Sequence, residues 1–299
     1  MIAFGCSITD PEKYKRCAEP GIALASEPDS VVLPHASIDS IFRSYNLLLD
    51  KAAELDDLEA LVVVHQDAEI VDPEFCAKVR RAFGDPEVGV AGCVGAIGVR
   101  SIAWWDGSVT WASFVHRYGE LGGGDLPAFS WDPDRLPAYA HTGEVDTVDG
   151  FVIAFSPWAV REVRFDESLG NLHGYDFDYC LQVRERGKKV VTEDFRVIHH
   201  HSLELISDIE TWVEAHMTIA EKWDSRMPLV GGQRGGDWKQ RARRAEADAA
   251  AGKAKAVTQQ LKFEALERQF DEVRRSASWR LTAPLRRLRG LFRGSPPRS

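Results

Sequence analysis

Short apolar runs alternate along the chain with segments in which apolar residues recur every three or four positions. Residues 2–6, 61–64 and 89–94 are runs of apolar residues and glycine, the pattern of strands covered on both faces. Residues 38–52 and 75–83 lie between them and show helical spacing. The alternation predicts an α/β fold with a Rossmann-like, mostly parallel central sheet flanked by helices. Ligands of such sheets bind beyond the carboxyl ends of the strands, where Asp67 follows the second run.

The second half of the chain is less regular. Residues 101–145 contain four tryptophans, a run of three glycines and several prolines, which predicts long loops or an irregular antiparallel excursion. Beyond it we expect strands at 148–155, 189–191 and 196–199, and helices at 177–186 and 209–223. Ser156 and Asp72 each precede a proline and are expected to cap helices, and Asp178 is expected to cap the first turn of its helix.

Glycine and charge increase after residue 226, where we place a boundary between a catalytic domain (1–226) and a C-terminal helical, basic tail (227–299). Residues 237–275 are rich in helix-forming residues. Their apolar residues at coiled-coil spacing, Phe263, Leu266, Phe270 and Val273, span too few turns to indicate an oligomer.

Charge is distributed unevenly. Residues 274–299 contain eight arginines and no acidic residue. Because the whole chain has a net charge of −9, residues 1–273 carry a net charge of −17. An acidic body is a poor surface for nucleic acid, and no nucleic-acid partner is expected. The tail interleaves its arginines with Trp279, Leu281, Leu285 and Phe292, a composition suited to peripheral contact with an anionic membrane. A solvated, disordered tail is the alternative.

Cysteine usage and the N-terminal residues indicate a cytoplasmic protein. The five cysteines are scattered and odd in number, which fits reduced thiols. The first residues lack the basic start and long apolar stretch of a signal peptide, and no apolar run is long enough to span a membrane. We expect a cytoplasmic location, with association at the inner face of the cell membrane through the tail.

An acidic residue at a strand end suits a metal-bound diphosphate, because a departing nucleoside diphosphate gains negative charge that a hard cation offsets. Asp67 is the expected ligand, with Mg²⁺ or Mn²⁺ as the cofactor. The plainer interpretation is that Asp67 only caps the turn after its strand.

The predicted strands and helices, with the acidic residue after residues 61–64, resemble an inverting family 2-type glycosyltransferase of the GT-A fold, StrF-domain-like branch. The resemblance covers roughly residues 1–225. His65-Gln66-Asp67 stands where that family has Asp-x-Asp, so Asp67 is implied as the metal ligand and His65 and Gln66 as donor-binding residues. Tyr175-Asp176 matches the Glu-Asp signature, with Tyr175 replacing the Glu, and implies Asp176 as the general base. Asp176 as a simple helix cap is the alternative.

The same resemblance assigns further residues. Val197-Ile198-His199 matches a Val-x-His pattern whose histidine completes the metal site, which favours His199, with His201 second. The alternative is a histidine that hydrogen-bonds locally. Asp149 and Gly150 resemble the acceptor-side loop, Trp104 and Trp105 offer a face for sugar stacking unless they are only core residues, and Asn46 resembles a position near the nucleotide.

The implied function is inverting transfer of a sugar from a nucleoside-diphosphate sugar to a glycan or lipid-linked acceptor. Residues 276–285 resemble an ending found in bacterial surface-polysaccharide glycosyltransferases, which implies a role in polysaccharide synthesis. Two alternatives remain open: a metal-dependent nucleotidyltransferase or phosphohydrolase, and a catalytically silent nucleotide-sugar-binding protein. The second is favoured by the departures at His65 and Tyr175.

Overall fold

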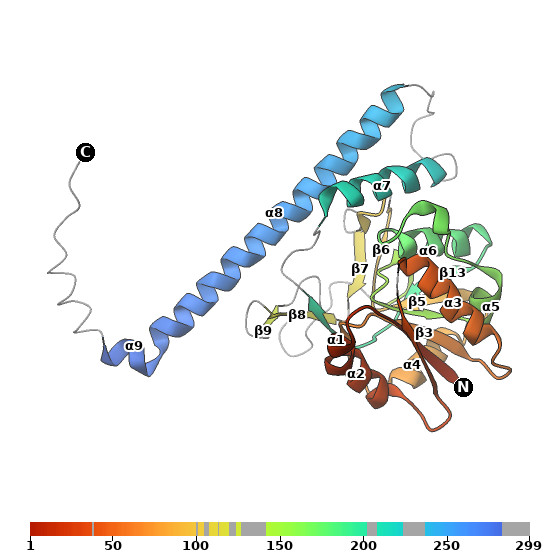
Figure 1. Ribbon diagram of the computed structural model, residues 1–299, viewed down its shortest axis with the longest axis horizontal. Helices are drawn as coiled ribbons and strands as arrows, with labels where there is room; N and C mark the ends of the chain where they lie inside the picture. The colour runs from red at the N-terminus through yellow and green to blue at the C-terminus, as the bar shows by residue number, and fades with distance from the viewer. Residues whose placement is uncertain are drawn as a thin grey trace.

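The computed structural model describes residues 1–37, 39–99, 101–104, 108–112, 114–119, 124–126, 142–201, 208–223 and 237–282. The sheets and most helices form one body, and a long C-terminal helix runs past it and away from it (Figure 1).

A seven-stranded sheet forms the centre of the body. Its order is β10 (Glu144–Val145), β13 (Lys189–Thr192), β5 (Val88–Gly92), β12 (Val152–Phe155), β3 (Ala60–Val64), β1 (Ile2–Ile8) and β2 (Val31–Ala36). Residues of β1, β3, β5 and β12 are almost completely buried, as the continuous apolar runs predicted.

The sheet is mixed. Strands β1, β2, β3, β5 and β13 share one direction, but β12 lies antiparallel between β3 and β5, and β10 is antiparallel to β13. The expected α/β class and mostly parallel sheet are therefore confirmed, with a reversed strand near the centre. A fully buried apolar run reads the same in either direction, so its pattern cannot reveal the reversal.

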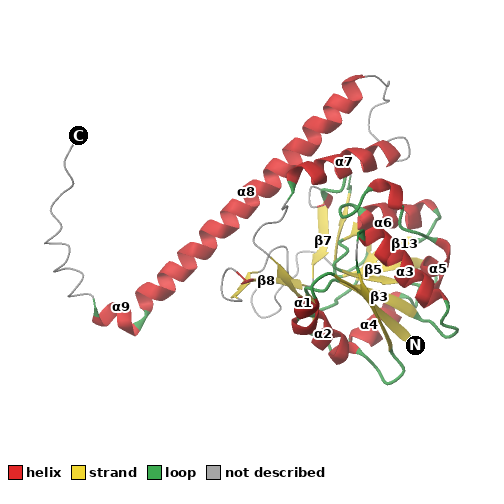
Figure 2. Ribbon diagram, viewed as in Figure 1, coloured by secondary structure: helices red, strands yellow, loops and turns green. Residues whose placement is uncertain are grey.

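Helices surround this sheet (Figure 2). Among them, α3 and α5 pack against each other and both contact β3, and α6 packs on β5, β13 and the short strand β11 (Thr147–Val148). The helices are α1 (Pro11–Arg16), α2 (Ala18–Ala25), α3 (Ile41–Ala53), α4 (Phe75–Ala82), α5 (Pro157–Glu162), the 3₁₀ helix η3 (Glu167–Leu169), α6 (Tyr175–Glu185), α7 (Ile209–Trp223), α8 (Asp237–Arg275) and α9 (Ala277–Leu281).

The expected caps met different outcomes. Ser156 caps α5 as expected, since its hydroxyl accepts from the Ala159 N–H. The prediction that Asp72 caps the next helix was wrong, because α4 begins at Phe75, two residues after Pro73, with Glu74 at its N-cap. Asp72 accepts from the Glu74 N–H, but its other oxygen is buried against Lys78 Nζ at 2.6 Å.

Two small sheets extend the body. One has the order β4 (Ala68–Ile70), β14 (Val197–His201), β8 (Phe114–Tyr118) and β9 (Gly124–Leu126); the other has β11 (Thr147–Val148), β6 (Val94–Ile97) and β7 (Ser108–Ala112). The antiparallel register of β14 with β4 sets His199 opposite Ala68, the residue that follows Asp67. This pairing joins the two sequence-distant parts of the candidate site.

The prediction that Asp178 caps the first turn of its helix was wrong, because no side chain caps the start of α6. The carboxylate is fully buried and accepts from Trp223 Nε1 at 2.8 Å and from Gln182 Nε2 at 2.8 Å. It also pairs with Lys222 Nζ at 2.7 Å. Asp178 therefore anchors α7 to α6.

The expected C-terminal helix is confirmed as α8, whose small buried residues pack toward α7. Phe263, Leu266, Phe270 and Val273 are exposed. The expected boundary at 226/227 and residues 283–299 of the basic tail lie outside the described residues. No described helix has both the length and the apolar character required to span a bilayer.

Candidate active site

The strand-end segment that follows β3 is held by backbone hydrogen bonds on two sides. The His65 N–H donates to the Phe151 carbonyl at 2.8 Å, and the His200 N–H donates to the Asp67 carbonyl at 2.7 Å. The segment therefore lies between the turn before β12 and the end of β14. Both contacts place side chains from separate parts of the chain around Asp67.

His199 faces Asp67. Its Nε2 lies 3.6 Å from Asp67 Oδ1, its side chain is nearly buried, and its ring stacks on Phe151 with centroids 4.5 Å apart and planes 11° apart. His200 turns the other way, with Nε2 2.6 Å from Glu69 Oε2. His199 and His200 therefore point to opposite faces of β14, as neighbouring residues of a strand do.

His65 joins the same cluster. The ligand atoms of His65, Asp67 and His199 all lie within 4.8 Å of one another, and His65 Nδ1 is 4.0 Å from Asp67 Oδ1. Ligands about 2.1 Å from one ion can be separated by at most about 4.2 Å, so the two measured separations from Asp67 fit a shared cation. Two imidazoles and a carboxylate are ordinary ligands for a divalent transition metal.

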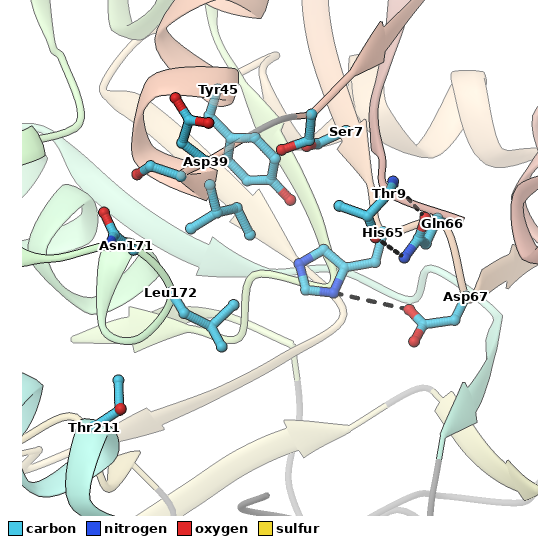
Figure 3. A pocket seen from close by; sticks show the side chains of 13 residues that line it. Ser7, Thr9, Asp39, Tyr45, His65, Gln66, Asp67, Asn171, Leu172 and Thr211 are labelled. Carbon is cyan, nitrogen blue, oxygen red and sulfur yellow. Dashed lines mark hydrogen bonds and ion pairs between the residues drawn. The ribbon is translucent and has the colours of Figure 1, made fainter. Parts of the chain in front are cut away.

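A cavity of about 480 Å³ opens beside this cluster (Figure 3). Asp67, His65 and Gln66 form one wall, with the two ends of Gln66 turned toward Thr9. Its lining is Ser7, Thr9, Ser37, Asp39, Ser40, Ile41, Tyr45, His65, Gln66, Asp67, Asn171, Leu172 and Thr211.

Several of these lining residues were not expected from the sequence. Ser7 and Thr9 lie at the carboxyl end of β1, where the strand-end rule that identified Asp67 would also have found them. Asp39 and Asn171 come from the connections before α3 and α6, and Thr211 lies in the first turn of α7; none of the three carries a local signal.

Asp176 lies at the start of α6, with both carboxylate oxygens held by backbone. The Gly150 N–H donates to Oδ2 at 2.9 Å, and the Phe177 N–H donates to Oδ1 at 2.9 Å. Burial raises the pKa of Asp176 to about 7, and the negative charge of Asp149 adds to that shift. A carboxyl group with a pKa near neutrality is suited to exchange a proton at physiological pH.

Asp149 lies beside Asp176 in the turn between β11 and β12. Its Oδ2 accepts from Trp104 Nε1 at 3.1 Å, and its Oδ1 accepts from the Phe151 N–H at 3.3 Å. Burial raises the pKa of Asp149, and His199 opposes that shift. Residues 149–151 thus connect the two halves of the site, because Gly150 holds Asp176 while Phe151 stacks on His199.

The other expected site residues occupy different places. Asn46 is not among the cavity-lining residues: it hydrogen-bonds the backbone of Phe165 in both directions at 2.9 Å and donates to Glu167. Trp104 is almost buried, with its indole N–H on Asp149. Trp105 lies outside the described residues, as does the side chain of His201.

Comparisons with known proteins agree with one another at the level of the family. The model of a family described as "Glycosyltransferase like family" matches residues 3–221. The streptomycin biosynthesis protein StrF of Streptomyces griseus is 30% identical over 212 residues, which cover 68% of this chain and 67% of StrF.

Solved structures are more distant. GalNAc-T7 with UDP, GalNAc and Mn²⁺ has 11% identity and a TM-score of 0.48, over 83% of this chain and 54% of that chain. The mannosyltransferase PcManGT from Pyrobaculum calidifontis, in complex with GDP-Man and Mn²⁺, has 10% identity and a TM-score of 0.46, over 98% and 87%. Similarity at this level carries no argument about the chemistry of this chain.

Proposed function

This chain belongs to the glycosyltransferase-like family, and from that premise we propose that it transfers a sugar, with inversion, from a nucleoside-diphosphate sugar to an acceptor hydroxyl. One observation carries the proposal: His65, Asp67 and His199 converge at the edge of a cavity of about 480 Å³. Pockets for small-molecule ligands and cofactors span roughly 300–1,000 Å³. The cavity therefore has room for the donor beside a cation site.

Asp67 and His199 would hold a divalent cation at this edge. When bound, such a cation offsets the negative charge that develops on the departing diphosphate. Gln66, in the same wall as Asp67, ties that wall to the loop after β1, because its side-chain oxygen accepts from the backbone N–H groups of Thr9 and Asp10 at 2.9 and 2.8 Å. These bonds fix the loop after β1 against the loop after β3, so the cavity wall is preformed.

Asp176 is the proposed general base. As the acceptor oxygen attacks the anomeric carbon, its proton passes to the Asp176 carboxylate and the bond from the anomeric carbon to the diphosphate oxygen breaks. Attack on the face opposite the leaving group inverts the anomeric configuration. The two backbone N–H groups that hold Asp176 orient it without neutralising it.

A finer part of the proposal concerns the acceptor. We infer a glycan or lipid-linked acceptor of bacterial surface-polysaccharide synthesis from the basic, apolar composition of residues 276–299. Deleting these residues should abolish sedimentation with anionic phosphatidylserine vesicles while leaving donor binding intact. Equal sedimentation of the full and shortened chains would reject membrane docking.

A two-part experiment tests the function. UDP-, GDP- and dTDP-sugars are screened with and without Mn²⁺ for a rise in Tm of the full chain, and the best donor is then assayed for nucleoside-diphosphate release with candidate acceptors. Stabilisation followed by nucleoside-diphosphate release supports sugar transfer. Release of pyrophosphate or phosphate would instead indicate a nucleotidyltransferase or hydrolase, and binding without turnover would indicate a silent binding protein.

A further inference from the structure

Two side chains from distant segments meet at the cation site. The Tyr175 hydroxyl lies 2.7 Å from His65 Nε2, although the two residues are 110 positions apart. These are also the positions at which the sequence departs from the family's acidic signatures. The two departures are therefore in contact and form a matched pair.

The Tyr175 ring is fixed on several sides. It is buried and packs edge-on against Phe42 and Tyr45, with ring centroids 6.1 and 5.3 Å away. A Cβ atom added at Gly150 would lie 2.6 Å from Tyr175 Cζ, so glycine there leaves the space that the phenol occupies. The phenol is therefore held with its hydroxyl at the His65 ring, and the Tyr45 hydroxyl is a second hydrogen-bonding neighbour.

The hydrogen bond gives the two imidazole nitrogens of His65 different partners. Because Nε2 is engaged by the phenol, the nitrogen that faces Asp67 is Nδ1, at 4.0 Å from Oδ1 (Figure 3). If Nε2 carries the hydrogen and donates it to the phenol oxygen, Nδ1 presents its lone pair toward Asp67 and His199. Outer hydrogen bonds of this kind fix the tautomer and the orientation of metal-binding histidines.

We propose that His65 is a third cation ligand through Nδ1, that the Tyr175 hydroxyl positions it by fixing this tautomer, and that the site prefers Mn²⁺ to Mg²⁺. The inference rests on the proposed function and deepens it. Mg²⁺ favours oxygen ligands, whereas two imidazoles with one carboxylate suit a transition metal. Tyr175 is a positioning residue here, since its hydroxyl touches the ligand and not the ion.

Metal binding alone tests the proposal, without sugar or turnover. Mn²⁺ is titrated into the full chain and the free ion is followed by electron paramagnetic resonance, with Mg²⁺ as a competitor. We expect Mn²⁺ to bind at least about 10-fold more tightly than Mg²⁺, and Y175F to weaken Mn²⁺ by about 10- to 100-fold, the usual effect of losing such an outer hydrogen bond. Pulsed measurements of nitrogen couplings should show two imidazoles in the wild type and one in H65A.

Tyr179 supplies a matched control. Its hydroxyl is also buried and donates a hydrogen bond, to the Ala159 carbonyl at 2.8 Å, but it lies in the core away from His65. Y179F should therefore keep wild-type Mn²⁺ affinity. If Y175F also keeps that affinity, or if H65A retains two nitrogen couplings, the inference is overturned.

The failure of this inference is distinguishable from failure of the proposed function. A wild-type chain that binds no Mn²⁺, or prefers Mg²⁺, overturns the metal assignment. The same chain releasing nucleoside diphosphate in the presence of EDTA would leave sugar transfer standing. Because Y175F preserves the aromatic packing, it keeps the test valid if H65A fails to fold.

Discussion

Replacing Asp176 with asparagine should separate turnover from donor binding. A positioned general base contributes about 10²- to 10⁴-fold to rate, so D176N should raise the barrier by about 3–5 kcal/mol. The asparagine oxygen can still accept from one of the Gly150 and Phe177 N–H groups, while its amide faces the other. We therefore expect a stability loss of about 1–3 kcal/mol from the mismatched donor. Asp176 does not line the cavity, so donor affinity should change little.

The assay pairs initial rates of nucleoside-diphosphate release with calorimetric titration of the donor. D50N is the control, because Asp50 is an exposed carboxylate that pairs with Arg164 at 3.3 Å on the surface. Exposed pairs contribute about 0–1 kcal/mol, so D50N should match the wild type in both measurements. Unchanged turnover in D176N would remove Asp176 from the mechanism. A parallel collapse of donor affinity would show that its role is structural.

Two further predictions concern titration and anchoring. Activity should rise with pH through about 7, because the base form of Asp176 is the carboxylate and burial raises its pKa to about 7; D149N should move this rise to lower pH in a pH–rate profile. Since the folded-state pKa is raised from 3.8, this group's stabilising contribution is complete below about pH 4 and is lost as pH increases through 7. D178N should lower the urea-unfolding free energy by about 1–3 kcal/mol, because it removes the buried charge that Lys222 and Trp223 contact, while Lys222 keeps Asp166 as a partner at 2.7 Å; a loss under about 0.5 kcal/mol would contradict the anchoring role.

Local pattern was sufficient for much of the central sheet and for one candidate cation ligand. Continuous burial of β1 and β3 leaves a readable apolar run in each, and the rule that ligands gather at strand ends led to Asp67. The long helix α8 was likewise readable from its helix-forming composition. These features depend on residues close together in sequence.

The apolar pattern did not reveal the turn at residues 149–151, although the family resemblance had indicated a loop at Asp149 and Gly150. The sequence predicted one strand over 148–155, but the chain forms β11, turns at Asp149–Phe151 and continues as β12. Apolar residues on both sides hide the turn in the sequence pattern. The contacts that depend on it come from α6: the Gly150 N–H donates to the Asp176 carboxylate, and the missing side chain of Gly150 leaves room for the Tyr175 ring.

The prediction for Asp178 was wrong for a related reason. An acid near a helix start is expected to cap it, but Gly174 lies at the N-cap of α6 and no side chain caps that end. Lys222 and Trp223, which bind Asp178, lie more than forty positions onward. Contacts at such separations leave no periodic trace in a single sequence.

Gly150 contacts both the proposed base and the proposed positioning residue, and Gly150→Ala should therefore disturb both. Its N–H holds Asp176, and its missing side chain admits Tyr175, whose Cζ would lie 2.6 Å from the new methyl group. Either the phenol leaves His65 or the turn shifts away from Asp176, so Mn²⁺ affinity and turnover should fall together, whereas Y175F should lower metal affinity with the Asp176 hydrogen bonds preserved. G252A is the matched control: a Cβ there meets nothing within 4 Å, and alanine should stabilise α8 by up to about 1 kcal/mol. A G150A chain with wild-type metal binding and turnover would show that residues 149–151 do not connect the cation site to the base.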